Sequence, residues 1–375
     1  MERIHGAHKL KLLIAGGGTG GHVFPALAVA REWLERDAGR EVIFVGTERG
    51  MEKRLIPEAG LRLETIRAAG LKGLGAIRMA RNLVQLGPGF VDSAAILRRH
   101  NFNVAFGVGG YAAGPMMLMA NIEGLPSVIF EPNAEPGFTN RVLADMATRI
   151  AAGYAAVAER WGSRAVATGC PVRAEFFASP PSRPDLRSRN ASVPPCRLLI
   201  TGGSQGSHAI NRAVIEALAP LAAVQATLPL AIAHQTGERD YDLVREAYLQ
   251  RGFDADVAPF FSNMPQRFSD ADIIVCRAGA ITVAEMAAAG RAAIFIPFGA
   301  ATDSHQLRNA QEMLRAGAAR LIPEPELTGD RLAREILALV RDPAQIAELG
   351  ARARLLARPH AARDIADLID EVARA

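Results

Sequence analysis

Cysteine is scarce in this chain of 375 residues, and its three copies, Cys170, Cys196 and Cys276, lie far apart. No Cys-x-x-Cys pair occurs, which excludes a zinc ribbon, and an odd number of distant thiols excludes a disulfide framework. We therefore expect a protein of a reducing compartment.

Lysine is also scarce, because only four of the 43 basic residues are lysines and the others are arginines. The formal net charge of +4 falls well short of a basic tail, so we expect no nucleic-acid partner. Hydrophobic residues make up 49% of the chain and charged residues 22%, which excludes a disordered or fibrous protein. The length predicts two domains.

Long uninterrupted hydrophobic runs are missing as well. The first apolar run, Leu10 to Ala15, contains Lys11 and is too short for the core of a signal peptide. Two stretches without charged residues, Asn101–Ile122 and Ala217–Gly237, approach the length of a membrane span. Both are interrupted by residues that favour turns, so we interpret them as separate elements joined by turns.

Short runs rich in Val, Ile and Leu alternate with longer stretches that favour helices. This alternation is typical of α/β folds, in which helices cover both faces of a parallel sheet. The strands that we predict are Lys11–Ala15, Glu41–Gly46, Val104–Val108, Ser127–Phe130, Arg197–Thr201, Leu230–His234, Asp272–Cys276 and Ala292–Pro297.

An internal repeat relates two parts of the chain, since Lys11–His22 aligns with Arg197–His208 without a gap. Each copy has a basic residue, Leu-Leu-Ile, and then Gly-Gly-x-x-Gly-x-His, the pattern of a strand, a glycine turn and a helix start. We infer two Rossmann-like, doubly wound domains, linked through the proline-rich segment Ser179–Cys196. The predicted domains are residues 1–172 and 173–349, with residues 350–375 forming a helix that packs back on the first.

The first glycine turn fits the dinucleotide fingerprint as Gly16-x-Gly18-x-x-Gly21, which is weak evidence when taken alone. An NAD site also needs an acid at the end of the second strand, and Glu48 is a poor candidate for it. His22 follows the turn. It is either a helix-capping or packed histidine, or a base or polar ligand contact, and its place beside a glycine loop favours the second.

Two further turns leave alternatives open. Ser204 in the second glycine turn either binds a phosphate or caps the next helix. Thr282 and Glu285 form either a capping box or, with the helix start, a site for a diphosphate and a ribose. The Asp254/Asp256 and Asp270/Asp272 pairs are compatible with a divalent ion, although turn formation is favoured for them.

Polar and glycine-rich segments follow two other predicted strands, at Gly107–Pro115 and Glu131–Gly137. Ligands bind at the carboxyl ends of strands in open α/β sheets, so Asn133 is either a turn residue or a partner for a sugar hydroxyl. Leu71–Val84 interleaves apolar and basic residues without an acid. A helix resting on its own core is favoured there, and docking on an anionic membrane is the alternative.

Six motifs in one order resemble a known family. These are Gly17–Pro25, Gly107–Pro115, Asn133–Asn140, Gly169–Arg173, Gly202–Asn211 and Cys276–Pro297. In them the chain is similar to the MurG family, the bacterial undecaprenyl-diphospho-muramoylpentapeptide N-acetylglucosaminyltransferases, over nearly its whole length.

The resemblance implies a GT-B fold, with two Rossmann-like domains facing each other across a cleft. It implies an inverting transfer of N-acetylglucosamine from UDP-N-acetylglucosamine to the 4-hydroxyl of lipid I, which gives lipid II with a β-1,4 link. It implies no cofactor and no bound metal. Because the acceptor lies in a bilayer, the resemblance also implies a peripheral protein on the cytoplasmic face of the inner membrane, and Leu71–Val84 is our candidate docking segment.

The motifs also imply roles for individual residues. His22 would be the general base, and Gly109, Gly110 and Tyr111 would shape the acceptor pocket. The residues implied to bind the donor are Thr19, Gly20, Gly21, Asn133, Arg173, Ser204, Phe261, Ala280, Ile281, Thr282, Val283, Ala284, Glu285 and Gln306.

Three positions depart from the family pattern. Phe130 and Pro132 stand where the family usually has His and Gln, which removes two polar side chains beside the expected site, and Cys170 replaces an asparagine. The rival predictions are a UDP-N-acetylglucosamine 2-epimerase of the same architecture, an NAD-dependent oxidoreductase, and a non-catalytic nucleotide-binding or membrane-scaffold protein. The second glycine turn lacks Gly-x-Gly-x-x-Gly, which disfavours the oxidoreductase.

Overall fold

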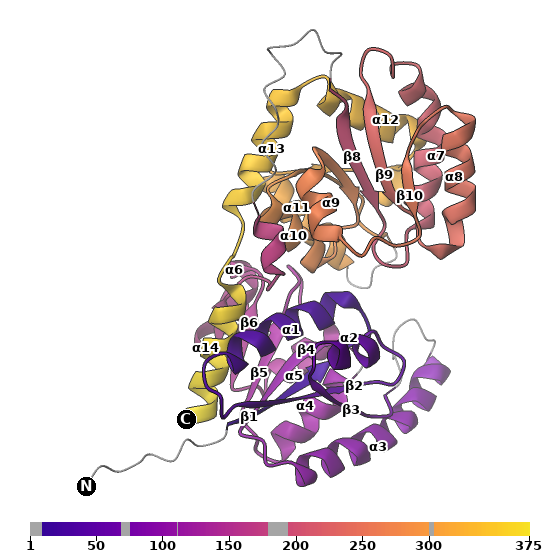
Figure 1. Ribbon diagram of the computed structural model, residues 1–375. Helices are drawn as coiled ribbons and strands as arrows, with labels where there is room; N and C mark the ends of the chain where they lie inside the picture. Colours follow the sequence, from indigo (N-terminus) through magenta and orange to yellow (C-terminus); the bar gives the residue numbers. More distant parts are fainter. Residues whose placement is uncertain (1–9, 69–75, 111, 179–193, 300–303) are drawn as a thin grey trace. The chain divides into compact units, whose positions relative to one another are not determined.

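The structure is a computed structural model that describes residues 10–68, 76–110, 112–178, 194–299 and 304–375. The chain forms two compact units (Figure 1). The first consists of Met1–Arg173 together with His360–Ala375, and the second of Ala174–Pro359. Residues 350–359 therefore belong to the second unit and the last helix to the first. Tyr111 and residues 71–75 of the candidate docking segment Leu71–Val84 lie outside the described residues.

The first unit is built on a seven-stranded parallel sheet with the order β3-β2-β1-β4-β5-β6-β7. Its strands are β1 (Lys11–Gly16), β2 (Glu41–Gly46), β3 (Arg62–Thr65), β4 (Val104–Gly109), β5 (Ser127–Glu131), β6 (Arg149–Ala152) and β7 (Ala165–Ala167). Its helices are α1 (Gly20–Leu34), α2 (Glu52–Glu58), α3 (Ala76–Arg99), α4 (Ala113–Ile122), α5 (Phe138–Ala144), α6 (Ala155–Trp161) and α14 (Ala361–Arg374), with a 3₁₀ turn η1 (Gly162–Arg164).

The second unit is built on a six-stranded parallel sheet with the order β10-β9-β8-β11-β12-β13. Its strands are β8 (Cys196–Thr201), β9 (Leu230–Gln235), β10 (Asp256–Ala258), β11 (Ile273–Cys276), β12 (Ala292–Phe295) and β13 (Arg320–Leu321). Its helices are α7 (His208–Ala222), α8 (Tyr241–Gln250), α9 (Met264–Asp270), α10 (Ala280–Ala289), α11 (His305–Arg315), α12 (Gly329–Val340) and α13 (Pro343–Leu355), with 3₁₀ turns η2 (Ala174–Phe177), η4 (Glu238–Asp240) and η6 (Glu324–Glu326).

Both sheets have the doubly wound order that the internal repeat predicts. In each, the chain runs outward from the first strand in one direction and then returns to continue in the other. The switch points lie between β1 and β4 and between β8 and β11. Because all strands are parallel, the loops after these strands meet at the carboxyl edge of each sheet, where ligands bind in such folds.

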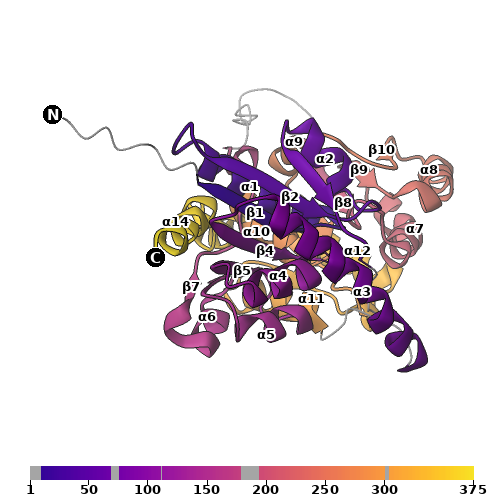
Figure 2. The same ribbon diagram turned by 90° about the horizontal axis from the view of Figure 1, so that it is seen from below.

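In each unit, one helix that covers part of the sheet comes after β13, the last strand in the sequence. Right-handed crossovers place α1 and α2 on one face of the first sheet and α3 to α6 on the other, and α1 reaches only as far as β4, which leaves β5 and β6 uncovered on the α1 face. The last helix, α14, fills this gap and contacts α1, β4, β5 and β6 (Figures 1 and 2). In the second unit α12 packs beside α7 in the same way.

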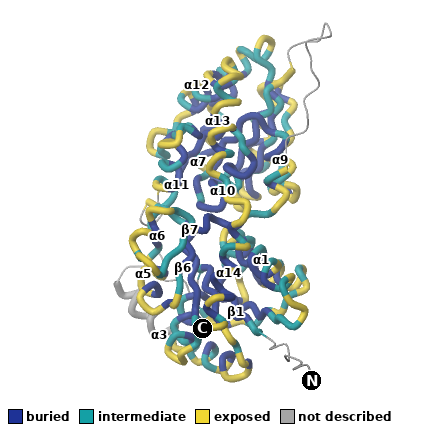
Figure 3. The backbone as a smooth tube through the Cα atoms, turned by 90° about the vertical axis from the view of Figure 1, so that its left-hand side faces the viewer, coloured by how far each residue is buried: buried dark blue, intermediate teal, exposed yellow. Residues whose placement is uncertain are grey.

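The core of each unit lies in its central strands and in the inward faces of their helices (Figure 3). Leu12, Leu13 and Ile14 of β1 and Ile273, Ile274 and Val275 of β11 are almost wholly buried, as expected of strands covered on both faces. Among the described residues, no helix is both long and apolar enough to cross a bilayer.

Candidate active site

The glycine loops after β1 and β4 contact each other through their backbones at the first switch point. The amide of Gly17 donates to the carbonyl of Gly109 at 3.3 Å. Gly110 has a φ of 87°, and a Cβ there would lie 2.2 Å from the carbonyl oxygen of Gly17. Glycine is therefore required at Gly110 both by its backbone conformation and by the closeness of the other loop.

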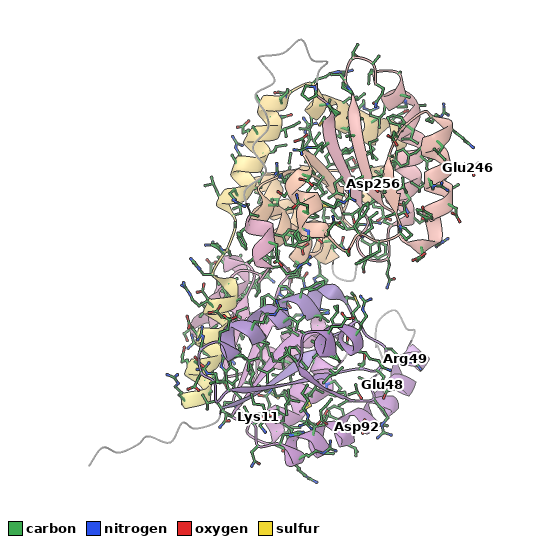
Figure 4. All side chains as sticks on the ribbon, in the orientation of Figure 1. Lys11, Glu48, Arg49, Asp92, Glu246 and Asp256 are labelled. Atoms are coloured by element: carbon green, nitrogen blue, oxygen red, sulfur yellow. The ribbon has the colours of Figure 1, made fainter. Side chains whose placement is uncertain are left out.

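A buried carboxylate forms a hydrogen bond with the backbone of the first glycine loop. Glu52, at the start of α2, is 1% exposed. Its carboxylate accepts hydrogen bonds from the amide of Gly18 at 2.7 Å and from the amide and hydroxyl of Thr47 at 2.9 and 3.0 Å. Glu48, the poor candidate for an acid after β2, is exposed (Figure 4). No pattern in the sequence distinguishes Glu52 from a surface acid.

His22 lies in the first turn of α1 and is half-buried. Its Nδ1 is 3.1 Å from the carbonyl oxygen of Gly17 and 3.4 Å from Oγ1 of Thr19. A carbonyl only accepts, so this bond assigns the proton of the neutral ring to Nδ1 and the lone pair to Nε2. The helix-capping alternative for His22 is wrong, because the N-cap residue is Thr19.

The side of the imidazole that carries Nε2 faces Gly109. A Cβ at Gly109 would lie 3.1 Å from both Nε2 and Cδ2 of His22. A larger residue there would crowd the ring, so this glycine leaves space beside the nitrogen that bears the lone pair. The geometry fits a base held by its other nitrogen, and the catalytic role of His22 stays a prediction.

Asn133 takes part in a turn organised by Glu131. The carboxylate of Glu131 is 1% exposed and accepts from the amide and side chain of Asn133, both at 2.9 Å. It also accepts from the amide of Gly137 and the side chain of Asn140, again at 2.9 Å. The turn alternative for Asn133 is therefore confirmed, whereas its contact with a sugar stays a prediction.

Two positions that depart from the family pattern lie close to this turn. Phe130 is a buried core residue of β5. The thiol of Cys170 donates to the carbonyl of Pro132 at 3.4 Å, and burial, with a further contribution from the charge of Glu131, raises the pKa of Cys170 above its ordinary value. The Cys170 departure thus places an un-ionised thiol beside the turn that Glu131 organises, whereas the Phe130 departure adds an apolar side chain to the core.

Arg173 belongs to the first unit, although sequence analysis placed it at the start of the second domain. Its guanidinium carbon lies 4.7 Å from the ring centre of Phe24, in α1. This cation–π contact places a positive charge beside the helix that begins with the glycine loop. Whether Arg173 binds a diphosphate stays a prediction.

In the second unit, the loop after β8 ends at the cap of α7. The hydroxyl of Ser207 accepts from the amide of Ile210 at 3.4 Å, so Ser207 is the N-cap residue. The capping alternative for Ser204 is therefore wrong. Ser204 is exposed in the middle of the glycine turn, and its role as a phosphate ligand stays a prediction.

Arg277, which follows β11, was missed as a functional candidate. Its guanidinium donates to the hydroxyl of Ser207 at 2.7 Å, to the carboxylate of Glu324 at 2.6 Å and to the carbonyl of Ile296 at 3.1 Å. Its side chain is only 11% exposed, and its guanidinium carbon lies 5.2 Å from the ring centre of Phe298. Arg277 thereby links the loops that follow β8, β11 and β12.

The helix that follows Arg277 begins earlier than a capping box requires. α10 starts at Ala280 with Gly279 as its N-cap residue, so Thr282 and Glu285 lie inside the helix. The capping-box alternative is wrong. The first bond of the helix runs from the amide of Val283 to the carbonyl of Gly279 at 2.9 Å, so the amides of Ala280–Thr282 precede it and favour an anion. The charge of Glu285, together with burial as the larger cause, raises the pKa of Cys276.

Two other donor candidates make backbone contacts at the same edge. The amide of Phe261 donates to the side-chain oxygen of Gln235 at 2.8 Å, so this N–H is already used within the protein. The side-chain oxygen of Gln306 accepts from the amides of Ala278 and Phe298 at 3.3 and 2.9 Å. Gln306 therefore lies beside the loops after β11 and β12, where a donor sugar is expected.

The Asp-x-Asp pairs lie elsewhere. Asp256 begins β10 and Asp272 directly precedes β11, so both are at the amino edge of the sheet. Asp272 accepts from the amide of Arg197 at 2.8 Å, and Asp256 pairs with Arg267. In the described parts of the chain, no three His, Cys, Asp or Glu side chains gather as a metal site would need.

The two parallel sheets, each doubly wound with a glycine loop at its switch point, define a two-domain protein of the nucleotide-binding α/β class. The family model for the glycosyltransferase family 28 N-terminal domain matches residues 12–152, and that for the C-terminal domain matches residues 197–369. The chain therefore belongs to glycosyltransferase family 28 and, within it, to the MurG family that its six motifs predicted.

Curated relatives span nearly the whole chain. One from Geotalea uraniireducens is 45% identical over 359 residues, covering 96% of this chain and 97% of its own length. One from Geobacter sulfurreducens is 44% identical over 362 residues, with 96% and 97% covered. Both are named UDP-N-acetylglucosamine–N-acetylmuramyl-(pentapeptide) pyrophosphoryl-undecaprenol N-acetylglucosamine transferase.

Solved structures confirm the predicted GT-B fold class. MurG of Acinetobacter baumannii has a TM-score of 0.75 at 31% identity, with 96% of this chain and 99% of that chain covered. The calicheamicin glycosyltransferase CalG4 has a TM-score of 0.67 at 14% identity, with 97% and 98% covered. A UDP-GlcNAc 2-epimerase from Neisseria meningitidis has a TM-score of 0.68 at 12% identity, with 96% and 100% covered, and shows a shared fold alone.

Proposed function

We propose that this protein transfers N-acetylglucosamine from UDP-N-acetylglucosamine to the 4-hydroxyl of the muramoyl group of lipid I, with inversion, to form lipid II. The observation that carries the proposal is the identity of 45% over 96% of the chain with a transferase of that name. The epimerase likeness, at 12% identity, concerns the fold only.

The donor is assigned to the second unit. Departing UDP gains negative charge on its diphosphate, and the amides at the start of α10 together with Ser204 are suited to that charge. The predicted contact of Glu285 with the ribose hydroxyls and that of Gln306 with the sugar belong to the same proposal. The Phe261 amide is used by Gln235, so its carbonyl is the group left to meet the uracil.

The acceptor hydroxyl is assigned to His22 in the first unit. A base whose Nδ1 is held by the Gly17 carbonyl takes a proton on Nε2, where the lone pair lies. A positioned base contributes about 10²–10⁴-fold to turnover. Gly109 and Gly110, which approach the same loop, are proposed to shape the acceptor pocket together with Tyr111.

An assay with UDP-N-acetylglucosamine and a short-chain lipid I analogue tests the activity. Release of UDP that depends on the analogue is expected. Loss of UDP-N-acetylglucosamine without the analogue would instead indicate the epimerase, and an absence of any turnover would refute the transferase.

The His22→Ala variant tests the base. We expect its kcat to fall by about 10²–10⁴-fold while its affinity for UDP stays the same. His360→Ala is the control, because His360 is exposed and makes no side-chain cap at the start of α14. Equal turnover in the His22 variant and the control would end the assignment.

We also propose that the protein acts at the cytoplasmic face of the inner membrane, as a peripheral protein. The support is the bilayer location of an undecaprenyl acceptor and the basic, apolar sequence of Leu71–Val84. Replacing Arg78 and Arg81 by Glu should weaken binding to vesicles that contain anionic phospholipid. Undiminished binding would place the docking surface elsewhere.

A further inference from the structure

One peptide group of the first glycine loop lies between an acid and the proposed base. The N–H of Gly18 donates to Oε2 of Glu52 at 2.7 Å. The carbonyl oxygen of Gly17, in the same peptide group, lies 3.1 Å from Nδ1 of His22. A carboxylate and an imidazole are thus bound to opposite ends of a single amide.

An amide with both ends bound in this way transmits polarisation. Its nitrogen and oxygen share one resonance system, so a carboxylate that accepts from the N–H increases the negative charge on the carbonyl oxygen. A chain of this kind strengthens each hydrogen bond by about 10–30%. A stronger acceptor at Gly17 favours the proton on Nδ1 of His22.

The state of Glu52 suits this role. Its three hydrogen-bond partners are all donors, two from Thr47 and one from Gly18, as the ionised form requires. At 1% exposure it is shielded from water, and charge-assisted bonds are roughly twice as strong as neutral ones.

We propose that Glu52 is a positioning residue that acts on His22 through the Gly17–Gly18 peptide group and holds the imidazole in the tautomer with its proton on Nδ1. The inference rests on the proposed role of His22 as the base. The proton of the acceptor hydroxyl then passes to Nε2, the proton on Nδ1 stays in place, and Glu52 takes up none.

Glu52 also fills space, so its packing and its charge must be separated. A Cβ at Gly17, Gly46 or Gly50 would lie 2.3, 2.5 or 1.9 Å from an atom of the Glu52 side chain. The Glu52→Gln variant keeps the size and loses the charge. Its amide keeps an oxygen for Thr47 but presents a donor to the N–H of Gly18. The Thr47→Val variant is the matched control, since it removes a donor to Glu52 and leaves the carboxylate bound to Gly18.

Nitrogen-15 NMR of the histidine side chains reports the tautomer, with the His22→Gln variant used to assign the signals. Above neutral pH we expect the wild-type protein and Thr47→Val to hold His22 with the proton on Nδ1. In Glu52→Gln we expect a mixture of tautomers, with kcat lowered about tenfold, the lower end of the range seen when metal-ligating histidines lose an outer partner. The affinity for UDP should stay within about twofold, because the amides at the start of α10 and Ser204, which are proposed to hold the diphosphate, belong to the second unit.

Three results would overturn the inference. The first is a wild-type protein in which His22 carries its proton on Nε2. This result would overturn the inference even if Glu52→Gln failed to fold, because it needs no variant. An unchanged tautomer and kcat in Glu52→Gln would do so as well. An equal effect of Thr47→Val would show that packing is responsible. Absence of transferase activity in the wild-type protein would remove the proposed function instead, and the tautomer measurement would still decide whether Glu52 acts on His22.

Discussion

The Asp370→Asn substitution should detach the last helix from the first unit. The carboxylate of Asp370, in α14, accepts from the indole of Trp33 at 2.8 Å and from the guanidinium groups of Arg36 and Arg40 at 2.9 Å each. The side chains of Asp370 and Arg40 are only 13% and 6% exposed. Asparagine keeps the size and one acceptor but removes the charge that both arginines face.

The size of the effect follows from which partners remain. Breaking a buried ion pair by removing one partner costs about 3–5 kcal/mol of unfolding free energy. Arg36 retains a second partner in Asp367, whereas Arg40 loses its ionic partner and is the more buried of the two. We therefore expect a loss near the lower limit, about 3 kcal/mol. With a urea dependence of about 2 kcal/mol per molar, the midpoint of unfolding falls by about 1.5 M.

Tryptophan fluorescence isolates the unit concerned. The two tryptophans of the chain, Trp33 and Trp161, both belong to the first unit, so urea unfolding followed by their emission reports that unit. Asp367→Asn is the control, because Asp367 is 62% exposed and contacts Arg36 alone among these residues. The control should shift the unfolding free energy by less than about 1 kcal/mol.

The dependence on pH gives a second check. Burial alone would raise the pKa of Asp370, but hydrogen bonds from Arg40, Arg36 and Trp33 outweigh it and lower the pKa. The stabilising contribution is therefore complete above the unfolded pKa of about 3.9 and is lost as the pH falls through the folded value. The difference between wild type and variant should shrink below about pH 4. An Asp370→Asn midpoint within 0.3 M, roughly the uncertainty of the method, would refute the reasoning.

Two further predictions concern buried groups. His234 is wholly buried between Tyr248 and Asn211, and burial lowers its pKa to about 3, so the native state loses stability as the pH falls below about 6.5. Between pH 7 and 5 the unfolding free energy of the second unit should fall by about 2 kcal/mol, as measured by hydrogen exchange of the amides of β9. A His234→Gln variant that kept the same dependence on pH would contradict the assignment. Burial is the larger of the causes that raise the pKa of Cys170 and of Cys276. In the native protein, iodoacetamide should therefore modify the half-buried Cys196 at least about tenfold faster than either of these two cysteines. Equal labelling of all three cysteines, read by mass spectrometry, would contradict this.

The long strands and the glycine loops could be predicted from the sequence because each has a local signal. All eight predicted strands are present with ends within two residues of those expected. The five that were missed, β3, β6, β7, β10 and β13, have two to four residues each. Length alone does not explain this, because β11 and β12 have four residues and were predicted. Each of the five missed strands contains only one Val, Ile or Leu and therefore leaves no hydrophobic run.

Local signals failed where partners come from afar. Glu52 and Arg277 each contact loops that follow other strands, and nothing in their own sequence context distinguishes a buried charge from a solvated one. The same limit explains Ser204 and Thr282, for which capping was a reasonable interpretation. The helices begin at His208 and Ala280, so the N-cap residues Ser207 and Gly279 each lie three positions from the residue expected to cap.

The position of α14 after the second unit in the sequence has a consequence for synthesis. During translation the sheet formed by β1 to β7 is made long before the helix that covers β4–β6, so that apolar face stays uncovered while the second unit is synthesised. The first unit is therefore completed only after the whole second unit has been made. A nascent or prematurely terminated chain presents this face to chaperones and proteases.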